Sequence, residues 1–227
     1  MIALNNSSLL CDGDLIFIRS GSYLYQKVAD MTRTWTSHVG VLFGGEHGEW
    51  MVAESRVPKV VYTPLETFLS RSVSRRFAVE RLRQGLETDA IKELRHAANK
   101  RMGRRYDLGF DYDARGEFCS KFAHEIYLEA LGVEIGKVET FREVVEKGSG
   151  VPLWFWRLWF LGSIPWERRT VTPASIFQSP LLQAIIQPTT LQSDPKQATP
   201  CHWPRLLKAL PLRTPAVETP KTLSTPS

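Results

Sequence analysis

The residues best suited to chemistry are a cysteine and a histidine that lie far apart in the chain, Cys119 and His38. Cys119 opens an apolar pattern with four-residue spacing, which predicts that it lies in the first turn of a helix. Unpaired backbone amides and the positive end of the helix dipole stabilise a thiolate there, and the same amides can bind an oxyanion. Taken alone, a cysteine flanked by two phenylalanines is more typical of an inert core residue.

A thiol nucleophile needs a base, and His38 is the best placed of the five histidines. It lies on a predicted strand, on the face opposite Val39 and Val41. If the following hairpin turns at Glu46, Glu54 faces His38 directly and can orient the imidazole. The prediction depends on strand register, and an exposed polar pair on the solvent side of the sheet is an equally good interpretation.

These residues must be positioned by strands and helices that the apolar periodicity predicts. Strands are expected at 14–18, 37–43, 49–55, 59–62 and 76–82, and helices at 24–31, 88–102 and 118–131. A glycine-rich turn at 44–48 joins the second and third strands as a hairpin. The fold class is therefore α+β, with an antiparallel sheet packed against helices.

The chain divides into a body at residues 1–187 and a tail at residues 188–227. The tail contains eight of the fourteen prolines, and its five basic and two acidic residues carry +3 of the formal charge of +5. Such a segment lacks backbone donors and apolar periodicity, so we expect a basic, disordered tail. Function is expected in the body, which is long enough for one domain.

Several classes of protein are disfavoured by composition and motifs. The longest apolar stretch, 151–161, is too short to span a bilayer, and the N-terminus does not resemble a secretory signal, so a cytoplasmic location is expected. Basic residues are not clustered as in a nucleic-acid-binding protein. The sequence has no phosphate-binding glycine loop and no metal-ligand cluster at useful spacing, so no cofactor is predicted.

Six short segments then resemble, in order and spacing, the circularly permuted, NlpC-type papain-like cysteine hydrolases, and most closely the YebB/YiiX-like branch. They are Gly13-Asp-Leu-Ile-Phe, Ser37-His-Val-Gly, Val52-Ala-Glu-Ser, Pro64-Leu, Gly103-Arg-Arg-Tyr-Asp107 and Phe118-Cys-Ser-Lys-Phe. The order in which the histidine precedes the cysteine is the hallmark of this family. The resemblance covers roughly residues 10–180, including a closing strand and turn near 169–175.

This resemblance implies a permuted papain-like fold with a small open barrel, and it implies roles for individual residues. Cys119 matches the nucleophile, His38 the base and Glu54 the orienting residue. Tyr106 matches a recurrent tyrosine of the substrate site, and Tyr112 is a second candidate for that role because it is close to Cys119 in sequence. The expected reaction is hydrolysis of an amide, ester or thioester through an acyl-enzyme.

The substrate is less well defined than the reaction. A bacterial murein peptide is one candidate by resemblance, and a lipid-like acyl compound is the other. The aromatic segment 154–166 favours the second, because Trp154, Trp156 and Trp159 would suit peripheral membrane contact or an acyl groove. Capping of the core by these rings is the simpler alternative. A non-catalytic lipid- or peptide-binding module and a lipid acyltransferase remain rival functions.

Overall fold

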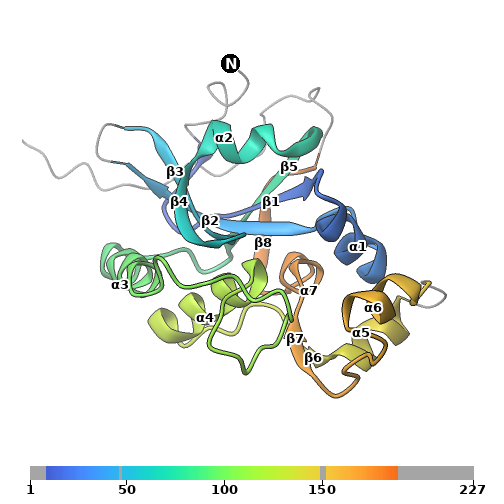
Figure 1. The fold of residues 1–227 in the computed structure, drawn as a ribbon. Helices are drawn as coiled ribbons and strands as arrows, with labels where there is room; N and C mark the ends of the chain where they lie inside the picture. Colours follow the sequence, from blue (N-terminus) through green and yellow to red (C-terminus); the bar gives the residue numbers. More distant parts are fainter. Residues whose placement is uncertain (1–8, 46–47, 149–151, 189–227) are drawn as a thin grey trace, which may run out of the picture.

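A six-stranded antiparallel sheet forms the centre of the computed structural model, which describes residues 9–45, 48–148 and 152–188 (Figure 1). Its strands are, in spatial order, β4 (Lys59–Pro64), β3 (Trp50–Arg56), β2 (His38–Gly44), β1 (Leu15–Ser20), β5 (Ser72–Leu82) and β8 (Leu182–Ile186). The sheet is open, with β4 and β8 at its edges, and does not close into a barrel. The predicted α+β class with an antiparallel sheet is confirmed.

Both faces of the sheet are buried, which explains why its central strands are continuous apolar runs. Leu15 and Phe17 of β1 pack into the larger core with Phe122, whereas the alternate residues Ile16 and Ile18 join a second, smaller core. This alternation follows from the two-residue period of a strand. Helices therefore have to cover each side.

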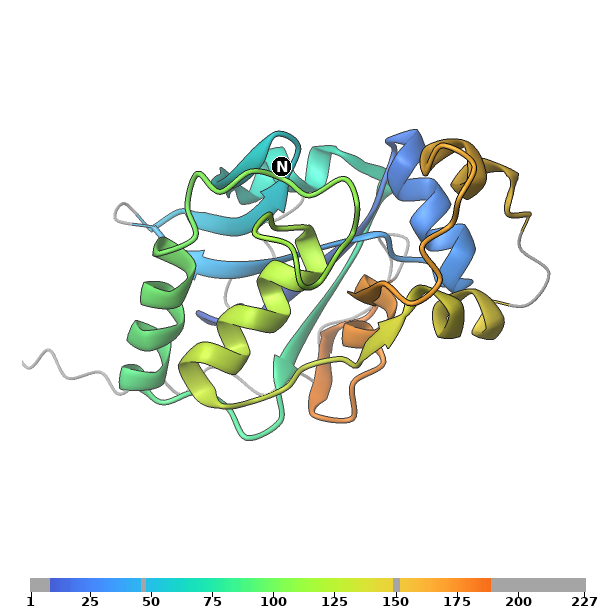
Figure 2. The ribbon, with the colours of Figure 1, turned by 60° about the horizontal axis from the view of Figure 1, so that its bottom comes forward.

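Four helices cover the sheet: α1 (Tyr23–Thr32), α2 (Leu65–Ser70), α3 (Thr88–Asn99) and α4 (Cys119–Leu131). Figure 1 shows α2 on one face and α3 and α4 on the other, with α1 at one end, and Figure 2 shows α4 running across its face. The predicted helices at 24–31, 88–102 and 118–131 all form. The second of them ends at Asn99, three residues before the predicted end, and the chain turns on to Gly103.

The helix α4 begins at Cys119, one residue after the predicted start, so Cys119 lies in its first turn as predicted, and the helix ends before Gly132. Gly132 has a φ of 64°, a left-handed conformation that glycine adopts without strain, and its amide donates back to the carbonyl of Leu128. Phe118, Phe122 and Ile126 are almost completely buried. Their four-residue spacing anchors one face of the helix against the sheet, which fixes its first turn relative to β2 and β3.

The remaining elements form a smaller group beside α1, which Figure 1 shows at one end of the sheet. They are β6 (Val138–Thr140), α5 (Phe141–Lys147), α6 (Trp154–Trp159), β7 (Arg169–Val171) and α7 (Pro173–Phe177). The strands β6 and β7 pair, and Thr140 and Glu143 form a capping box at the start of α5. The predicted strand and turn at 169–175 correspond to β7 and the start of α7. The predicted disordered tail, beyond Pro188, lies outside the described residues.

Replacing Phe122 by Ala should test how firmly α4 is anchored. The side chain is fully buried, so the cavity left behind should lower the free energy of unfolding by about 3–5 kcal/mol. Leu128→Ala on the exposed side of the same helix is the matched control and should cost less than about 1 kcal/mol. Urea titrations followed by circular dichroism would measure both, and equal losses would contradict this packing.

Candidate active site

Cys119 is the first residue of α4 and is a free, buried thiol. The preceding Phe118 has an extended backbone, and no side chain caps this end of the helix. The first amides of a helix have no partner within it, so those at the start of α4 remain available to an anion. This is the location at which a thiolate and an oxyanion are both stabilised.

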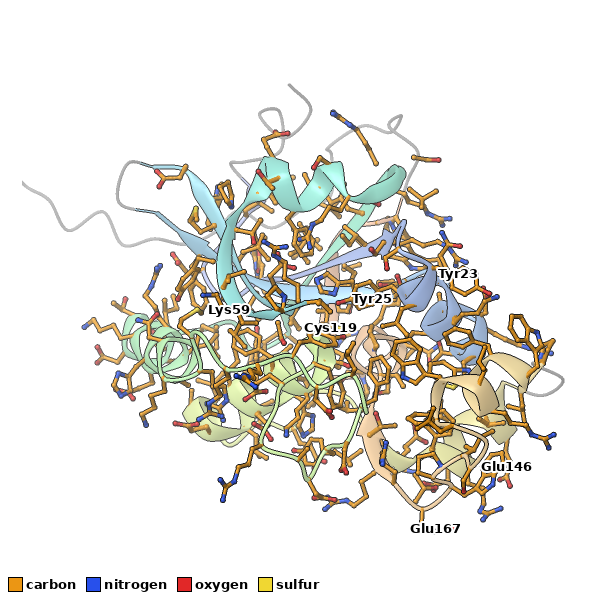
Figure 3. The ribbon with its side chains drawn as sticks, in the orientation of Figure 1. Tyr23, Tyr25, Lys59, Cys119, Glu146 and Glu167 are labelled. Carbon is orange, nitrogen blue, oxygen red and sulfur yellow. The ribbon has the colours of Figure 1, made fainter. Side chains whose placement is uncertain are left out.

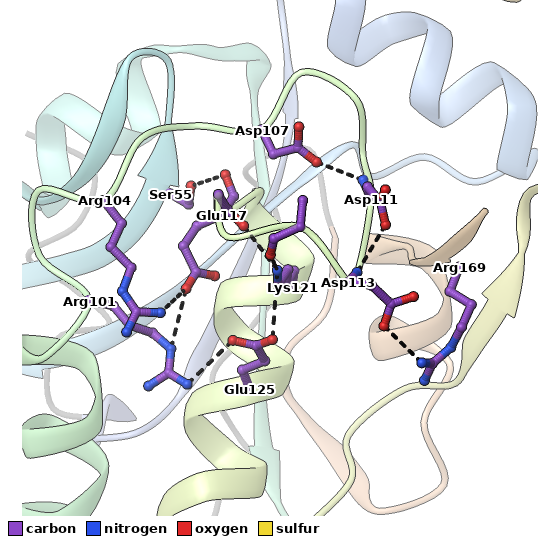
Figure 4. Close-up of polar contacts among 12 residues, drawn as sticks. Ser55, Arg101, Arg104, Asp107, Asp111, Asp113, Glu117, Lys121, Glu125 and Arg169 are labelled. Carbon is purple, nitrogen blue, oxygen red and sulfur yellow. Dashed lines mark hydrogen bonds and ion pairs between the residues drawn. The ribbon is translucent and has the colours of Figure 1, made fainter. Parts of the chain in front are cut away.

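Buried polar contacts hold the chain that leads into Cys119 (Figure 4). The Lys121 ammonium donates to the carbonyl oxygens of Ala114 and Gly116, the second at 3.0 Å, and the Ser55 hydroxyl donates to the Glu117 carbonyl at 2.9 Å. The Glu117 carboxylate is bound by Arg104 at 2.9 Å. The loop before α4 is therefore tied both to its own helix and to β3.

His38 and Glu54 form a hydrogen bond of 2.6 Å between Nε2 and Oε2, and both side chains are buried. Their burial rules out the solvent-exposed pair considered from the sequence. The predicted register is wrong, however, because Val41 faces Ala53 and Leu42 faces Val52, which places Glu54 diagonally from His38. The displacement preserves the alternation of the strand, so both side chains still share a face.

The His38 imidazole lies between two aromatic rings. Phe68 of α2 stacks on it with centroids 5.6 Å apart and an interplanar angle of 29°. The Tyr25 ring of α1 lies 5.1 Å away at a tilt of 53°. These rings restrict rotation of the imidazole while Glu54 holds Nε2, and Nδ1 has no hydrogen-bond partner among the described residues. The second nitrogen is thus available to the thiol.

Charges around His38 favour its protonated form. Burial by itself lowers the pKa of an imidazole, but here Cys119 and then Glu54 outweigh it and raise the pKa of His38 to about 9. Burial also raises the pKa of a carboxyl, but His38 and Arg71 reverse this for Glu54 and lower its pKa to about 2. At neutral pH Glu54 is therefore a carboxylate and His38 an imidazolium, and the two charges stabilise each other.

Glu54 has further partners on its second oxygen. The Thr63 hydroxyl donates to Oε1 at 2.6 Å, and Arg71 Nη2 donates to the same atom at 2.6 Å. The Arg71 guanidinium also lies 5.0 Å from the centroid of the Phe68 ring, the ring that stacks on His38. Arg71 thus supports both the charge of Glu54 and the aromatic wall beside the imidazole.

A small, mainly apolar cavity adjoins Cys119. It is lined by residues of α1, α4, α5, α6 and β7 and of the loops beside them: Tyr25, Val28, Met31, Ser37, Phe110, Phe118, Cys119, Ser120, Phe141, Trp156, Thr170, Val171, Thr172 and Pro173. Figure 3 shows Tyr25 and Cys119 close together at this place. Its volume is about 20 Å³, room for about one methyl-sized group, and its walls offer few polar contacts, so a longer acyl group would require side chains to move.

A larger groove, of about 670 Å³, lies between β6, α5 and α7. Its charged residues include Lys137 and Lys147, and both pair with Glu139. Cys119 lines the smaller cavity and not this groove, so the candidate site adjoins the smaller cavity. Among the described residues no cluster of three or more histidine, cysteine or acidic side chains could hold a metal ion.

The two candidate tyrosines differ in position. Tyr106 is buried near the site, and burial followed by Cys119 raises its pKa well above the usual range. Its ring contacts Tyr25 at 6.3 Å. Tyr112 instead packs against His124 at 5.6 Å and under the Arg169 guanidinium, and it does not line the Cys119 cavity. The structure therefore brings Tyr106, but not Tyr112, to the candidate site.

The three tryptophans predicted for membrane contact also differ in how exposed their side chains are. Trp156 is 1% exposed and lines the cavity, so its predicted place at a membrane interface is wrong. Trp159 is partly buried, and its indole donates to the Leu108 carbonyl at 3.0 Å. Trp154 is 58% exposed. No helix in the described part of the chain is long and apolar enough to cross a membrane.

Four residues around Cys119, His38 and Glu54 were not found from the sequence: Tyr25, Thr63, Phe68 and Arg71. Each comes from an element whose position relative to β2 depends on tertiary packing. Only Thr63 could have been found indirectly from the sequence. The strand β4 follows β3 after a short turn and pairs with it, so the alternation of side chains along β4 places Thr63 on the same face as Glu54. Nothing in the local sequence distinguishes Arg71 from the other arginines of the chain.

Comparison with known proteins places the chain in a recognised group. The family of permuted papain-like amidase enzymes, YaeF/YiiX or C92, matches residues 10–186. The chain is 26% identical over 173 residues to the uncharacterized protein YiiX of Escherichia coli K12, covering 76% of this chain and 84% of YiiX. A crystal structure described as metalloprotein yiiX from Escherichia coli O157:H7 has a TM-score of 0.69 and 25% identity, covering 78% and 96% of the two chains.

Replacing Glu54 by Gln should reveal how far the carboxylate stabilises the His38 imidazolium. Without this negative charge the pKa of His38 should fall by about one unit or more, so the imidazolium is lost at a lower pH. In the pH profile of Cys119 alkylation by iodoacetamide, we expect the inflection that marks loss of the imidazolium to move down by about one unit from its wild-type position near pH 9.

The matched control is Glu80→Gln, which changes a buried carboxyl of β5 whose pKa is raised by burial to about 7. Its alkylation profile should coincide with that of the wild type, since Glu80 does not contact His38. Identical profiles for all three proteins would contradict the electrostatic role of Glu54. Mass spectrometry of the intact protein would follow the reaction.

Proposed function

Because the chain belongs to the permuted papain-like amidase family, we propose that it is a thiol hydrolase in which Cys119, His38 and Glu54 form a catalytic triad. The observation that carries the proposal is the buried 2.6 Å hydrogen bond between His38 and Glu54, with the free imidazole nitrogen beside a thiol at an uncapped helix start. A hydrogen bond between His38 and Glu54 with only a structural role would not need the Cys119 thiol beside the second imidazole nitrogen.

In the proposed reaction, His38 already holds the proton of the Cys119 thiol on Nδ1 before the substrate binds, and Nε2–H donates to Glu54. The Cys119 sulfur attacks a carbonyl carbon, and the carbonyl oxygen becomes an oxyanion near the first amides of α4. When the tetrahedral intermediate collapses, His38 returns the proton to the departing amine, alcohol or thiol. Water then adds to the acyl-enzyme through the same base, which releases a carboxylic acid and regenerates the thiol.

The cavity favours an apolar acyl group as the part of the substrate that binds beside Cys119. Its walls include Val28, Phe141 and Trp156 and carry no charged side chain. An amide, ester or thioester of a short apolar acid would fit this environment better than a charged peptide. Transfer of the acyl group to an acceptor other than water would use the same first half of the reaction, so an acyltransferase is the alternative outcome.

Incubation with p-nitrophenyl butyrate should test the acyl-enzyme directly. The wild type is expected to release a burst of p-nitrophenol and to gain the mass of one butyryl group, whereas Cys119→Ala should do neither. His38→Gln should slow acylation about 100-fold or more because the proton acceptor is lost. If the wild type releases no more p-nitrophenol than the Cys119→Ala background and gains no acyl mass, the fold would be a non-catalytic binding module.

We also propose that the exposed end of α6 contacts an anionic membrane surface. Leu158 is 71% exposed and Leu161 is 95% exposed, next to Trp154. Arg157 belongs to the same helix, and the Lys27 ammonium lies 5.1 Å from the ring of exposed Tyr23. Apolar and aromatic side chains with neighbouring cations suit the interface of a bilayer that contains acidic lipids.

Sedimentation with phosphatidylserine-containing vesicles should measure this contact. Leu158→Glu removes apolar area worth about 1.5–3 kcal/mol on burial and adds a negative charge, so binding should fall at least about tenfold. Leu128→Glu, at an exposed leucine of α4, is the matched control and should bind as the wild type does. Equal binding by all three proteins would exclude α6 as the contact.

A further inference from the structure

Arg101 is a buried cation that the triad does not use. It lies in the turn after α3, and its guanidinium is within ion-pair distance of three carboxylates. Nη1 lies 2.5 Å from Glu129 Oε2, Nη2 lies 3.3 Å from Glu125 Oε2, and Nε lies 3.4 Å from Glu117 Oε1. Figure 4 shows Arg101 beside Glu117 and Glu125. The arginine side chain is 8% exposed, so the guanidinium is largely shielded from water.

The three carboxylates belong to two adjacent parts of the chain. Glu125 and Glu129 lie one turn apart on α4, whereas Glu117 lies two residues before the helix begins. Glu117 is completely buried, and its carboxylate also binds Arg104 at 2.9 Å. Burial, and then Glu125, raise the pKa of Glu117, and Arg101 opposes them. The negative charge of Glu117 thus depends on the guanidinium groups beside it.

Glu125 also connects Arg101 to the contacts that Lys121 makes with the loop before α4. Its Oε1 lies 3.8 Å from the Lys121 ammonium, which donates to the Gly116 carbonyl at 3.0 Å. At the other end, Arg101 Nη1 donates to the Ala97 carbonyl of α3 at 3.1 Å. The contacts form a continuous network from α3, through α4, to the loop that leads into the nucleophile.

Such a network can fix the position of α4 along its own axis, which apolar packing does less well. Phe122 and Ile126 attach the helix to the core, but burial of apolar surface has no preferred direction. A guanidinium presents its donors in a rigid planar fork, so it holds its partners at defined places. Because Arg101 engages groups before and within α4, it defines where the helix starts. A displacement of about 1 Å at a reacting group can cost about 100-fold in rate.

We propose that Arg101 is a positioning residue, which places Cys119 at the distance from His38 that the thiol chemistry requires. Arg101 does not line the cavity beside Cys119, and its contacts are with α3, α4 and the loop between them. It therefore acts through the position of the helix and not on the reacting atoms. The inference rests on the proposed acyl-enzyme mechanism and extends it to a residue outside the cavity.

Arg101→Met removes the charged fork and should let Cys119 move away from His38. Acylation by p-nitrophenyl butyrate should then slow about 100-fold. Burial lowers the pKa of His38, and the charge of Cys119 is the largest of the influences that raise it to about 9. A more distant Cys119 should therefore move the inflection of the iodoacetamide profile below its wild-type position near pH 9. Both reactions would be followed well below the midpoint of thermal unfolding of the variant.

Arg81→Met is the matched control, because it removes another buried guanidinium. Arg81 is 13% exposed and binds Asp14 through Nε at 2.7 Å and Nη2 at 2.8 Å, away from the start of α4. This variant should also unfold at a lower temperature, but its acylation rate and alkylation profile should match the wild type. The inference is overturned if folded Arg101→Met matches the wild type in either measurement, or if Arg81→Met changes both measurements to the same extent.

Should Arg101→Met not fold, Glu117→Gln decides instead. It keeps the shape of the side chain and removes only the negative charge that Arg101 and Arg104 bind. We expect acylation about tenfold slower than in the wild type and an inflection at lower pH. Wild-type values for either measurement would then overturn the inference.

The same measurements distinguish failure of the inference from failure of the proposed function. If the wild type is alkylated at Cys119 but never acylated by the ester, the acyl-enzyme mechanism fails and the role of Arg101 in it fails too. If the wild type and Arg101→Met are acylated equally, the mechanism stands and only the role of Arg101 is rejected. Thermal unfolding of each variant would show that the compared proteins are folded.

Discussion

The hydrogen bond between His38 and Glu54 forms where neither side chain reaches solvent, and this burial constrains the structure around it. A carboxylate removed from water loses several kcal/mol of hydration unless other groups replace it. For Glu54 the replacements come from three elements: His38 on β2, Thr63 on β4 and Arg71 after α2. The order of strands in this half of the sheet and the position of α2 therefore depend on one another.

The charge on His38 also depends on α4, which lies on the face of the sheet opposite to α2. An imidazolium in a buried site needs negative charge on more than one side, and it has Glu54 at one nitrogen and Cys119 near the other. Cys119 can supply that charge only if α4 begins where it does. The contacts of Lys121 and Ser55 with the preceding loop fix that starting point. Hydrogen bonds away from the thiol therefore determine where Cys119 lies relative to His38.

Much of this arrangement could be predicted from the sequence, for identifiable reasons. Alternation in β2 and four-residue spacing in α4 are local signals, so the strand of His38 and the helix start at Cys119 were found correctly. The exact register was not, because a glycine-rich turn is compatible with several registers and only packing selects one. Arg71 and Tyr25 could not be found, since their roles arise from the positions of α2 and α1 in space. Tyr112 was misplaced because proximity in sequence does not determine which side of a loop faces the thiol.

The reversed order of histidine and cysteine in the chain has a structural consequence for substrate selection. The β2–β3 hairpin positions His38 and Glu54, and α4 positions Cys119 after a long connection, while Thr63 of β4 and Arg71 after α2 hold the Glu54 carboxylate. The cavity walls, in contrast, come from α1 on one side and from α5, α6 and β7 on the other. These elements lie outside the β2–α4 segment, although Phe110 and Phe118 of that segment complete the walls and Tyr25 of α1 also contacts the His38 ring. Most of the cavity wall and the residues around the His38–Glu54 hydrogen bond thus come from different parts of the chain.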